Sequence, residues 1–307
     1  RRRHTRCGRD WSSDVCSSDL GCNNFCTYCV VPYARGREVY REPKDVLEEA
    51  RKALGRGIKD IVLIAQNVNS YNYGENKDNI LDFPDLLRSA TNIKGNFWLS
   101  FATSHPKDMS DKLIRTIAEN KRICRHIHLP AQSGDNDILA SMNRKYTREH
   151  YLELIKKIRH YIPEASITTD IIVGFPGETE EQFQNTKRLL EEAEFDMAYI
   201  AQYSPRPGTA AAGLKDDVRP EEKKRREEKL METLRETAYR NNKKYLNEKA
   251  QVMIEGKNTK GEWYGRTDTN KNVKITKNKD CSFYPGKIAE IMITGVQDFG
   301  LHGEPRE

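Results

Sequence analysis

The chain has 307 residues, a formal net charge of +6 and a mean hydropathy of −0.83. This length suits one large domain or two unequal ones, and no apolar run approaches the roughly 20 residues of a membrane helix. The start, RRRHTR, is not followed by the apolar segment of a secretory signal. Seven cysteines in such a cytoplasmic setting predict metal or catalytic use and argue against a disulfide framework, and the mild basic bias is compatible with RNA.

The first twenty residues differ from the rest of the chain. RRRHTRCGRDWSSDVCSSDL shows no periodic apolar face and no strand pattern. We therefore expect residues 1–20 to be an unrelated leader, and we assign no function to Cys7 or Cys16.

Residues 21–215 alternate between short apolar strands and amphipathic helices. The expected strands are 60–67, 97–104, 125–132, 167–175 and 196–204, and the expected helices are 42–57, 108–120, 147–161 and 179–193. Repeated βα units predict an α/β fold with a parallel sheet, which places ligands at the carboxyl ends of the strands. Polar residues follow that rule, because each of these comes just past an apolar strand: Asn67, Ser104, Gln132, Ser133 and Ser204.

The pattern changes after residue 215. Residues 216–248 predict a connecting helix that starts near Pro220, and its EEKKRREEK run suits either phosphate contact or a solvated helix face. Residues 249–304 show short alternating strands separated by Gly and Asn turns, which predict a small all-β barrel. Small barrels of this kind commonly bind nucleic acid.

The stretch GCNNFCTYCVVPYARG holds Cys22, Cys26 and Cys29 in a CxxxCxxC pattern. Three thiolates leave one iron of a [4Fe–4S] cluster without a protein ligand, so that iron can bind a small molecule. A structural zinc site is one alternative, but it needs four ligands, and the nearest candidates lie in the leader: His4, Cys7 and Cys16. Chance clustering of buried thiols is the other alternative.

The motif, with Tyr28 before its last cysteine, resembles the radical S-adenosylmethionine enzymes. That resemblance implies a partial (β/α)6 barrel, here with one strand missing, in which the open iron is chelated by S-adenosylmethionine. Further sequence segments, taken together in this order, narrow the resemblance to the methylthiotransferases: LIAQNVNSY, SFATSHPKD, HLPAQSG, LASMNRKY, TTDIIVGFPGETEE and AQYSPRPGTAA. The terminal barrel resembles a TRAM domain, the RNA-binding module of that family.

Three branches of the family, which differ in substrate, are possible for this chain. One acts on N6-isopentenyladenosine at position 37 of tRNA, one on N6-threonylcarbamoyladenosine at that position, and one on an aspartate of a ribosomal protein. CTYCVVPYARGRE and AQNVNSY are most similar to the isopentenyladenosine branch, whereas the threonylcarbamoyl branch tends toward a Gly-His stretch at residues 66–68.

The resemblance also implies roles for individual residues. Cys22, Cys26 and Cys29 would ligate the cluster and carry its radical chemistry. The implied cofactor-binding residues are Tyr28, Asn67, Ser104, Gln132, Ser133 and Thr169, for which the alternatives are strand-end hydrogen bonding and, for Tyr28, core packing. Substrate-side positions are Tyr203, Ser204, Arg206 and Gly208.

Other polar residues have simpler interpretations. We expect His105 and His128 to be structural histidines, and Cys124 and Cys281 to be small buried or surface residues. Arg35, Arg37 and Arg144 could meet the cofactor carboxylate or tRNA phosphates, or form surface ion pairs of about 0–1 kcal/mol. In TDIIVGFPGET the glycines need only mean a tight turn.

The implied reaction consumes two molecules of S-adenosylmethionine, one for the methyl group and one for the radical that acts at C2 of the adenine. It needs a second [4Fe–4S] cluster, held by three cysteines of an N-terminal domain that this sequence lacks. We therefore expect a truncated enzyme that binds one cluster and cleaves S-adenosylmethionine without inserting sulfur, or an RNA-binding fragment without catalysis. The implied partners are a tRNA anticodon stem-loop and an electron donor such as flavodoxin or ferredoxin, with no membrane and a monomeric chain.

Overall fold

The computed structural model describes residues 13–74, 80–276 and 282–305, and its larger part is an open barrel of six parallel strands. The strands are β1 Ser13–Ser17, β4 Asp60–Ile64, β7 Trp98–Ala102, β8 His126–His128, β9 Ser166–Val173 and β10 Met197–Gln202. They form two three-stranded sheets, β1-β4-β7 and β8-β9-β10, which a parallel bridge between Leu99 and Ile123 joins. All five strands expected from the sequence are confirmed, each somewhat shorter than expected, and β9 begins one residue earlier, at Ser166.

The expectation that no strand precedes Gly21 was wrong. β1 pairs with β4 in parallel register, Cys16 opposite Leu63, and the Cys16 side chain is fully buried in the main core. β2 (Asp19–Leu20) then pairs antiparallel with β3 (Val39–Tyr40). The segment SDVCS is too polar to stand out as a buried strand, and the neighbouring β4 edge supplies its hydrogen bonds. The barrel therefore has all six strands, and Cys7 lies outside the described residues.

Helices follow most of the strands and cover one face of the sheet. They are α1 Val31–Arg35, α2 Pro43–Gly55, α3 Phe83–Thr91, α4 Asp111–Glu119, α5 Asn136–Ser141, α6 Arg148–Tyr161, α7 Glu180–Ala193 and α8 Pro220–Lys243. The four helices expected before residue 215 are confirmed as α2, α4, α6 and α7, whereas α1, α3 and α5 were not expected. Capping explains several starts, because Ser110, Thr147 and Thr179 each accept a hydrogen bond from a backbone N–H of the first turn.

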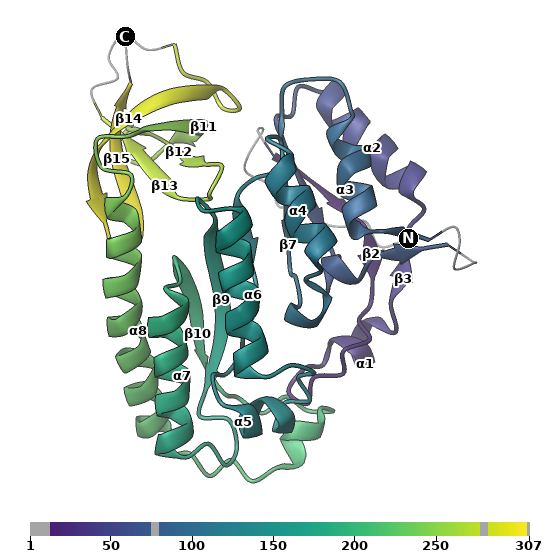
Figure 1. Ribbon diagram of the computed structural model, residues 1–307, viewed down its shortest axis with the longest axis vertical. Helices are drawn as coiled ribbons and strands as arrows, with labels where there is room; N and C mark the ends of the chain where they lie inside the picture. Colours follow the sequence, from purple (N-terminus) through teal and green to yellow (C-terminus); the bar gives the residue numbers. More distant parts are fainter. Residues whose placement is uncertain (1–12, 75–79, 277–281, 306–307) are drawn as a thin grey trace.

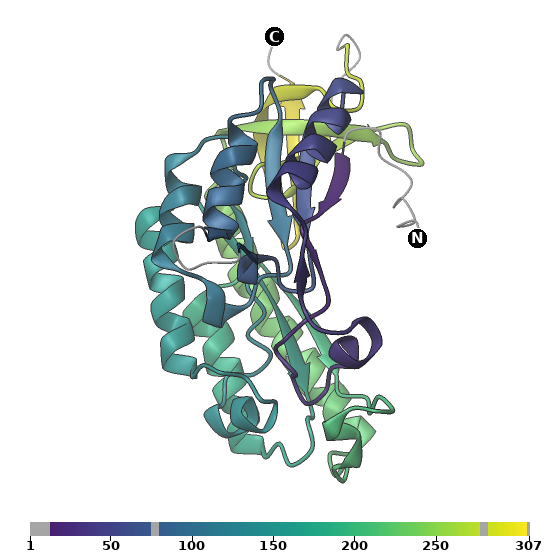
Figure 2. The same cartoon turned by 90° about the vertical axis from the view of Figure 1, so that its right-hand side faces the viewer.

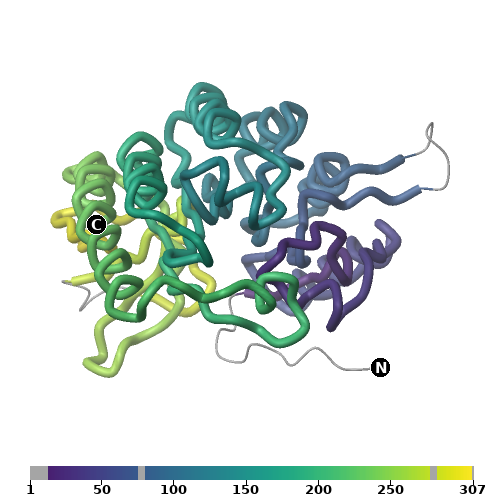
Figure 3. The backbone as a smooth tube through the Cα atoms, turned by 90° about the horizontal axis from the view of Figure 1, so that it is seen from below, coloured from purple at the N-terminus to yellow at the C-terminus, as the bar shows by residue number. Residues whose placement is uncertain are grey.

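Viewed along the barrel, the helices form an arc around the strands (Figure 3). β1 and β10 are the two edge strands and do not pair with each other, so the barrel stays open between them. Side elements are short: the hairpin of β5 (Asn72–Tyr73) and β6 (Leu81–Asp82), and 3-10 turns at 68–70, 106–108 and 210–213. No helix in the described part of the chain combines the length and apolarity needed to cross a membrane.

The expected terminal barrel is confirmed as five strands closed in the order β11-β12-β13-β15-β14. Their bounds are β11 Lys249–Lys257, β12 Trp263–Thr267, β13 Asn272–Ile275, β14 Ile288–Gln297 and β15 Gly300–Pro305. α8 leads into this barrel along the side of the molecule (Figures 1 and 2).

The small barrel docks on the amino ends of the parallel strands. Arg266 of β12 donates to the buried Asp60 at the start of β4, and Lys271 Nζ lies 2.6 Å from Asp196 Oδ1, just before β10. Trp98 and Cys124 pack with Met253 of β11 in the same interface. Residues 21–30, which hold the CxxxCxxC motif, run from β2 to α1, and α1 lies far from the small barrel (Figure 1).

Candidate iron-sulfur and cofactor site

The cysteine motif forms the loop between β2 and α1. Cys22 N donates to Gly36 O at 3.1 Å, and Cys29 N donates to Cys26 O at 2.9 Å, so the loop closes on itself. Gly21 begins the loop with φ +79°, and a Cβ at this position would lie 2.1 Å from Arg37 O. Only glycine fits such a close approach at positive φ, so Gly21 sets the entry of the loop.

Cys26 lies near both Cys22 and Cys29, and side-chain donors approach two of the three sulfurs. Cys22 and Cys26 are buried and Cys29 is half-buried. Asn24 Nδ2 lies 3.5 Å from Cys22 Sγ, and Arg144 Nη1 donates to Cys26 Sγ at 3.4 Å. Burial raises the pKa of the Cys22 and Cys29 thiols, and nearby Cys26 raises both further.

A cluster stays the prediction for this loop, because it offers three thiolates and a structural zinc site needs four ligands. In the part of the chain that the structure describes, no group of three or more His, Cys, Asp or Glu side chains converges on one metal position. A cubane cluster binds each thiolate at a different iron, so its ligands stand further apart than those of a mononuclear site. Cationic and amide donors next to thiolate sulfurs are the hydrogen bonds that tune such clusters, and Asn24 and Arg144 supply them.

Arg144 is held rigidly in this site. Its Nε donates to the Tyr146 hydroxyl at 2.8 Å and its Nη2 to Pro130 O at 2.8 Å, and the residue is 8% exposed. The alternative of a surface ion pair is therefore wrong for Arg144. Arg35 and Arg37 are exposed, and Arg37 lies over the Phe25 ring.

Three of the expected cofactor-binding residues follow the strands β4, β7 and β8 and lie at the same end of the barrel. Asn67, Ser104 and Gln132 are all buried, with exposures of 1%, 5% and 8%. Asn67 Nδ2 donates to Asp108 at 2.7 Å, whereas Asn67 Oδ1 and Ser104 Oγ are buried without a hydrogen-bond partner among the described residues. Unpaired buried polar atoms are costly, and their presence at strand ends fits a polar cofactor that would pair with them.

Ser133 and Thr169 already have protein partners. Ser133 Oγ accepts from Asp135 N at 3.2 Å and lies 3.3 Å from Thr186 Oγ1. Thr169 Oγ1 accepts from Ala131 N and donates to Leu129 O. Both hydroxyls thus make the strand-end hydrogen bonds that were the alternative interpretation, and their contact with a cofactor stays a prediction.

The segment after β10 crosses to the cysteine loop. Ala211 N donates to Thr27 O at 2.8 Å, and Tyr203 OH donates to Ala211 O at 2.9 Å. Tyr28 packs against the apolar cluster that contains Tyr203 and Phe175, so its core packing is confirmed. Arg206 lies near enough to Cys29 to favour its thiolate, while Ser204, Arg206 and Gly208 are exposed.

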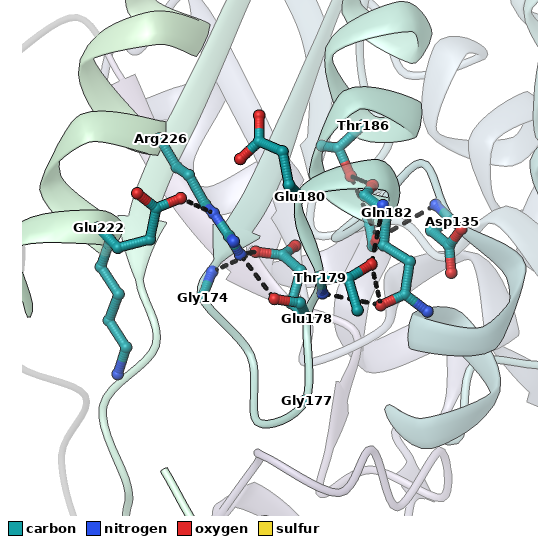
Figure 4. Close-up of polar contacts among 12 residues, drawn as sticks. Asp135, Gly174, Gly177, Glu178, Thr179, Glu180, Gln182, Thr186, Glu222 and Arg226 are labelled. Carbon is teal, nitrogen blue, oxygen red and sulfur yellow. Dashed lines mark hydrogen bonds and ion pairs between the residues drawn. The ribbon is translucent and has the colours of Figure 1, made fainter. Parts of the chain in front are cut away.

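The turn between β9 and α7 is tight, as its glycines predict, with φ +68° at Gly174 and +81° at Gly177. The sequence did not reveal what holds it. Glu178 accepts from Gly174 N at 2.6 Å and from Arg226 Nη1 at 2.7 Å, and Arg226 reaches it from α8 (Figure 4). Arg226 also donates to Glu222 at 2.7 Å. The EEKKRREEK run of α8 is therefore not uniformly solvated, since Arg226 is buried whereas neighbouring Arg225 is exposed.

The structural interpretation of His105 is confirmed. Its Nδ1 accepts from Lys107 N at 3.2 Å, its backbone bonds the Asn69 side chain, and it is 5% exposed. Burial, with smaller effects of Arg144 and Lys107, lowers the pKa of His105 to about 2, so the ring is neutral. Cys124 is likewise buried as expected, whereas Cys281 lies outside the described residues.

The open parallel barrel and its three-cysteine loop define a radical S-adenosylmethionine protein. The chain belongs to that family: the Radical SAM superfamily matches residues 20–190, and the TRAM domain matches residues 243–305.

Curated relatives point further within the family. Over 286 residues the chain is 46% identical to a tRNA-2-methylthio-N(6)-dimethylallyladenosine synthase of Alkaliphilus oremlandii, with 92% of this chain and 60% of the relative covered. It is 47% identical to the protein of the same name from Clostridium tetani, with 92% and 62% covered. The chain thus spans about 60% of the length of these relatives.

Solved structures agree on the fold. Coproporphyrinogen III oxidase from Escherichia coli, a radical SAM enzyme, matches with a TM-score of 0.54 at 13% identity, over 94% of this chain and 70% of that one. A radical S-adenosylmethionine methyltransferase from Kitasatospora setae matches with a TM-score of 0.54 at 19% identity, over 64% and 35%.

Proposed function

We propose that this chain is the radical and RNA-binding part of a tRNA methylthiotransferase that acts on C2 of N6-isopentenyladenosine at position 37. The observation that carries the proposal is the cysteine loop, with Arg144 against Cys26, in a chain 46% identical to tRNA-2-methylthio-N(6)-dimethylallyladenosine synthase. The name shared by the relatives favours the isopentenyladenosine branch over the threonylcarbamoyl one. The terminal barrel and α8 supply the surface for tRNA, a polyanion that basic residues attract.

Cys22, Cys26 and Cys29 would hold a [4Fe–4S] cluster and leave one iron for S-adenosylmethionine. When bound, this pair supplies the reductive cleavage that starts radical chemistry at an unreactive carbon. The chain's own residues do the positioning: Arg144 donates to Cys26 Sγ, and Asn67 and Ser104 offer unpaired buried oxygens at the strand ends. The half-buried loop limits water access to the thiolates.

One cluster is what the described cysteines can hold. Beyond the motif, the described part of the chain contains Cys16 and Cys124, which are buried in separate apolar clusters. Neither can join a second set of three ligands. We therefore propose that this chain alone cleaves S-adenosylmethionine without inserting sulfur, as a monomer that receives electrons from a flavodoxin or ferredoxin.

The test is anaerobic reconstitution with iron and sulfide, followed by EPR of the reduced chain with and without S-adenosylmethionine. A [4Fe–4S] signal that shifts on addition supports an open iron in the cysteine loop. The triple variant Cys22→Ala/Cys26→Ala/Cys29→Ala should show no signal, whereas Cys124→Ala should match the parent chain. A chain that takes up no cluster would refute the radical function and leave RNA binding alone.

Nucleoside mass spectrometry tests the missing sulfur insertion. The reconstituted chain should yield 5′-deoxyadenosine but no methylthiolated nucleoside from tRNA that carries N6-isopentenyladenosine. Methylthiolated product made by this chain alone would contradict the proposal of a single cluster.

A further inference from the structure

Three polar side chains stand on the concave face of the sheet, where the proposed function has given them no role. They are His128 of β8, Asp170 of β9 and Tyr199 of β10, on three neighbouring strands. Asp170 and Tyr199 are partners in the parallel register, and His128 pairs with Thr168, two residues before Asp170.

Alternation along β9 shows which way they face. Ile167, Thr169 and Ile171 are each 0% exposed, and the two isoleucines belong to the main core beneath the helices. Because successive side chains of a strand point to opposite faces, Asp170 points away from the helices into the open barrel. Tyr199 behaves in the same way, since it is 59% exposed while its neighbour Ala198 is buried at 1%.

His128 contacts both of the other side chains. His128 Nε2 lies 3.4 Å from Asp170 Oδ2, and His128 Nδ1 lies 2.9 Å from Thr168 Oγ1. The His128 and Tyr199 rings meet in an edge-type arrangement, with their centroids 6.1 Å apart. His128 is thus held between Thr168 and Asp170 and can steady the Asp170 carboxylate, while most of the Tyr199 side chain stays exposed.

This group lies next to the cysteine loop. Ile172 follows Asp170 by two residues on the same face, and it packs against the same small apolar cluster as Tyr28. Two residues of a parallel strand span about 6.6 Å, so Asp170 lies roughly one base width from the region where the loop meets the sheet. A group bound at Asp170 therefore lies close to the place where the proposed radical forms.

We propose that Tyr199 and Asp170 bind the target adenine after it has left the anticodon loop stack, with His128 as a positioning residue for Asp170. RNA proteins bind splayed bases by stacking them on aromatic rings and by hydrogen bonds to their edges. Tyr199 supplies the ring, and the Asp170 carboxylate accepts from the N6–H that an isopentenyl group leaves on the adenine. The inference rests on the proposed function and adds to it the residues that select the base.

Fluorescence anisotropy of the reconstituted full chain tests this inference with two stem-loop RNAs. One carries N6-isopentenyladenosine at the target position, and the other is identical except for a uridine there. The parent chain should bind the first RNA more tightly, and Tyr199→Ala should reduce that preference by about 5-fold to 100-fold, as expected for loss of one base–aromatic stack. Tyr199→Phe should keep the preference, and Tyr161→Ala, which removes a tyrosine on the outer helix α6, should not change it.

The polar pair is tested by a double-mutant cycle on the same ratio. Asp170→Ala and His128→Ala should each lower the preference, and the double variant should lose no more than Asp170→Ala alone, because His128 acts through Asp170. Equal preference in Tyr199→Ala and the parent chain, or additive losses in the cycle, would overturn the inference. A parent chain that binds neither RNA would instead refute the proposed function.

Discussion

Arg144 Nη1 lies 3.4 Å from Cys26 Sγ, although the two residues are 118 positions apart in the chain. The Arg144 guanidinium donates hydrogen bonds to Tyr146 and Pro130, so its charge and its N–H donors stay beside the cysteine loop. A buried cationic donor beside a cysteine sulfur is the kind of hydrogen bond that tunes an iron-sulfur cluster.

Arg144→Ala should therefore reduce iron bound after reconstitution and lower the free energy of unfolding by about 1.5–3 kcal/mol, the range for hydrogen bonds to charged groups. Arg144→Lys should recover only part of the iron, because an ammonium cannot reproduce three directed hydrogen bonds. Iron content per chain and urea unfolding measure both effects. Arg37→Ala, which removes an exposed arginine near the same loop, should keep its iron; equal losses in the two alanine variants would contradict this role.

His105 predicts acid sensitivity. Its folded pKa of about 2 lies below its ordinary value of 6.5, so the unfolded state binds the extra proton. The stability that His105 contributes is complete above pH 6.5 and is lost as the pH falls toward 2, with about 2 kcal/mol lost at pH 5.

Urea unfolding of the chain at pH 5 and pH 7.5 measures this loss. His105→Asn should make the difference between the two pH values smaller, since an amide oxygen can accept from Lys107 N without titrating. His126, whose pKa burial lowers to about 3, adds a loss of the same sign that remains in this variant. The exposed His160→Asn is the control; an unchanged pH difference in His105→Asn would show that His105 is not neutral in the fold.

The buried pair of Glu178 and Arg226 holds the β9–α7 turn to α8. Arg226→Met should lower the free energy of unfolding by about 3–5 kcal/mol, because it leaves the Glu178 carboxylate buried and unpaired. The double variant Glu178→Gln/Arg226→Met should be more stable than Arg226→Met, since no charge is then stranded. Thermal and urea unfolding give the cycle, with the exposed Arg225→Met as a control that should cost under about 1 kcal/mol. A double variant no more stable than the single one would argue against a stranded carboxylate.

Asp60 and Arg266 join the two barrels. The Asp60 side chain is 0% exposed, so Arg266→Ala should cost about 3–5 kcal/mol and loosen the small barrel. Limited trypsin digestion should then cleave between α8 and the small barrel faster than in the parent chain. Lys249→Ala removes an exposed ion pair with Glu290 on the same barrel and should leave digestion unchanged. If Arg266→Ala resists trypsin as well as the parent does, the docking does not depend on this pair.

Thiol reactivity should distinguish the buried Cys16 and Cys124 from the cysteines of the cysteine loop. Burial, with smaller effects of nearby carboxylates, raises the pKa of Cys16 to about 12, which lowers its thiolate fraction about a thousandfold relative to a thiol of ordinary pKa 9.0. In the iron-free native chain, iodoacetamide should label Cys29 and leave Cys16 and Cys124 unmodified, as followed by mass spectrometry. Labelling of Cys16 as fast as Cys29 would mean that β1 does not occupy the sheet edge.

Local patterns in the sequence predicted most of the strands and helices of this protein. Short apolar runs predicted five strands of the large barrel, alternating runs predicted the strands of the small one, and amphipathic helical patterns predicted α6 and α7. The CxxxCxxC spacing predicted Cys22, Cys26 and Cys29 as cluster ligands, because three thiolates in one loop leave one iron of a [4Fe–4S] cluster open. These features are local, so neighbouring residues suffice to specify them.

Contacts between distant segments were decided only in the folded chain. β1 becomes a strand because β4 offers it a hydrogen-bonding edge, not because SDVCS is apolar. Arg226 looks like one more charge on an exposed helix until Glu178 meets it from another element, and Arg144 reaches Cys26 only after the chain has closed a barrel. Such pairings form because a buried polar or charged group loses its water and needs a protein partner. The two partners lie far apart in the sequence, so no local pattern contains both.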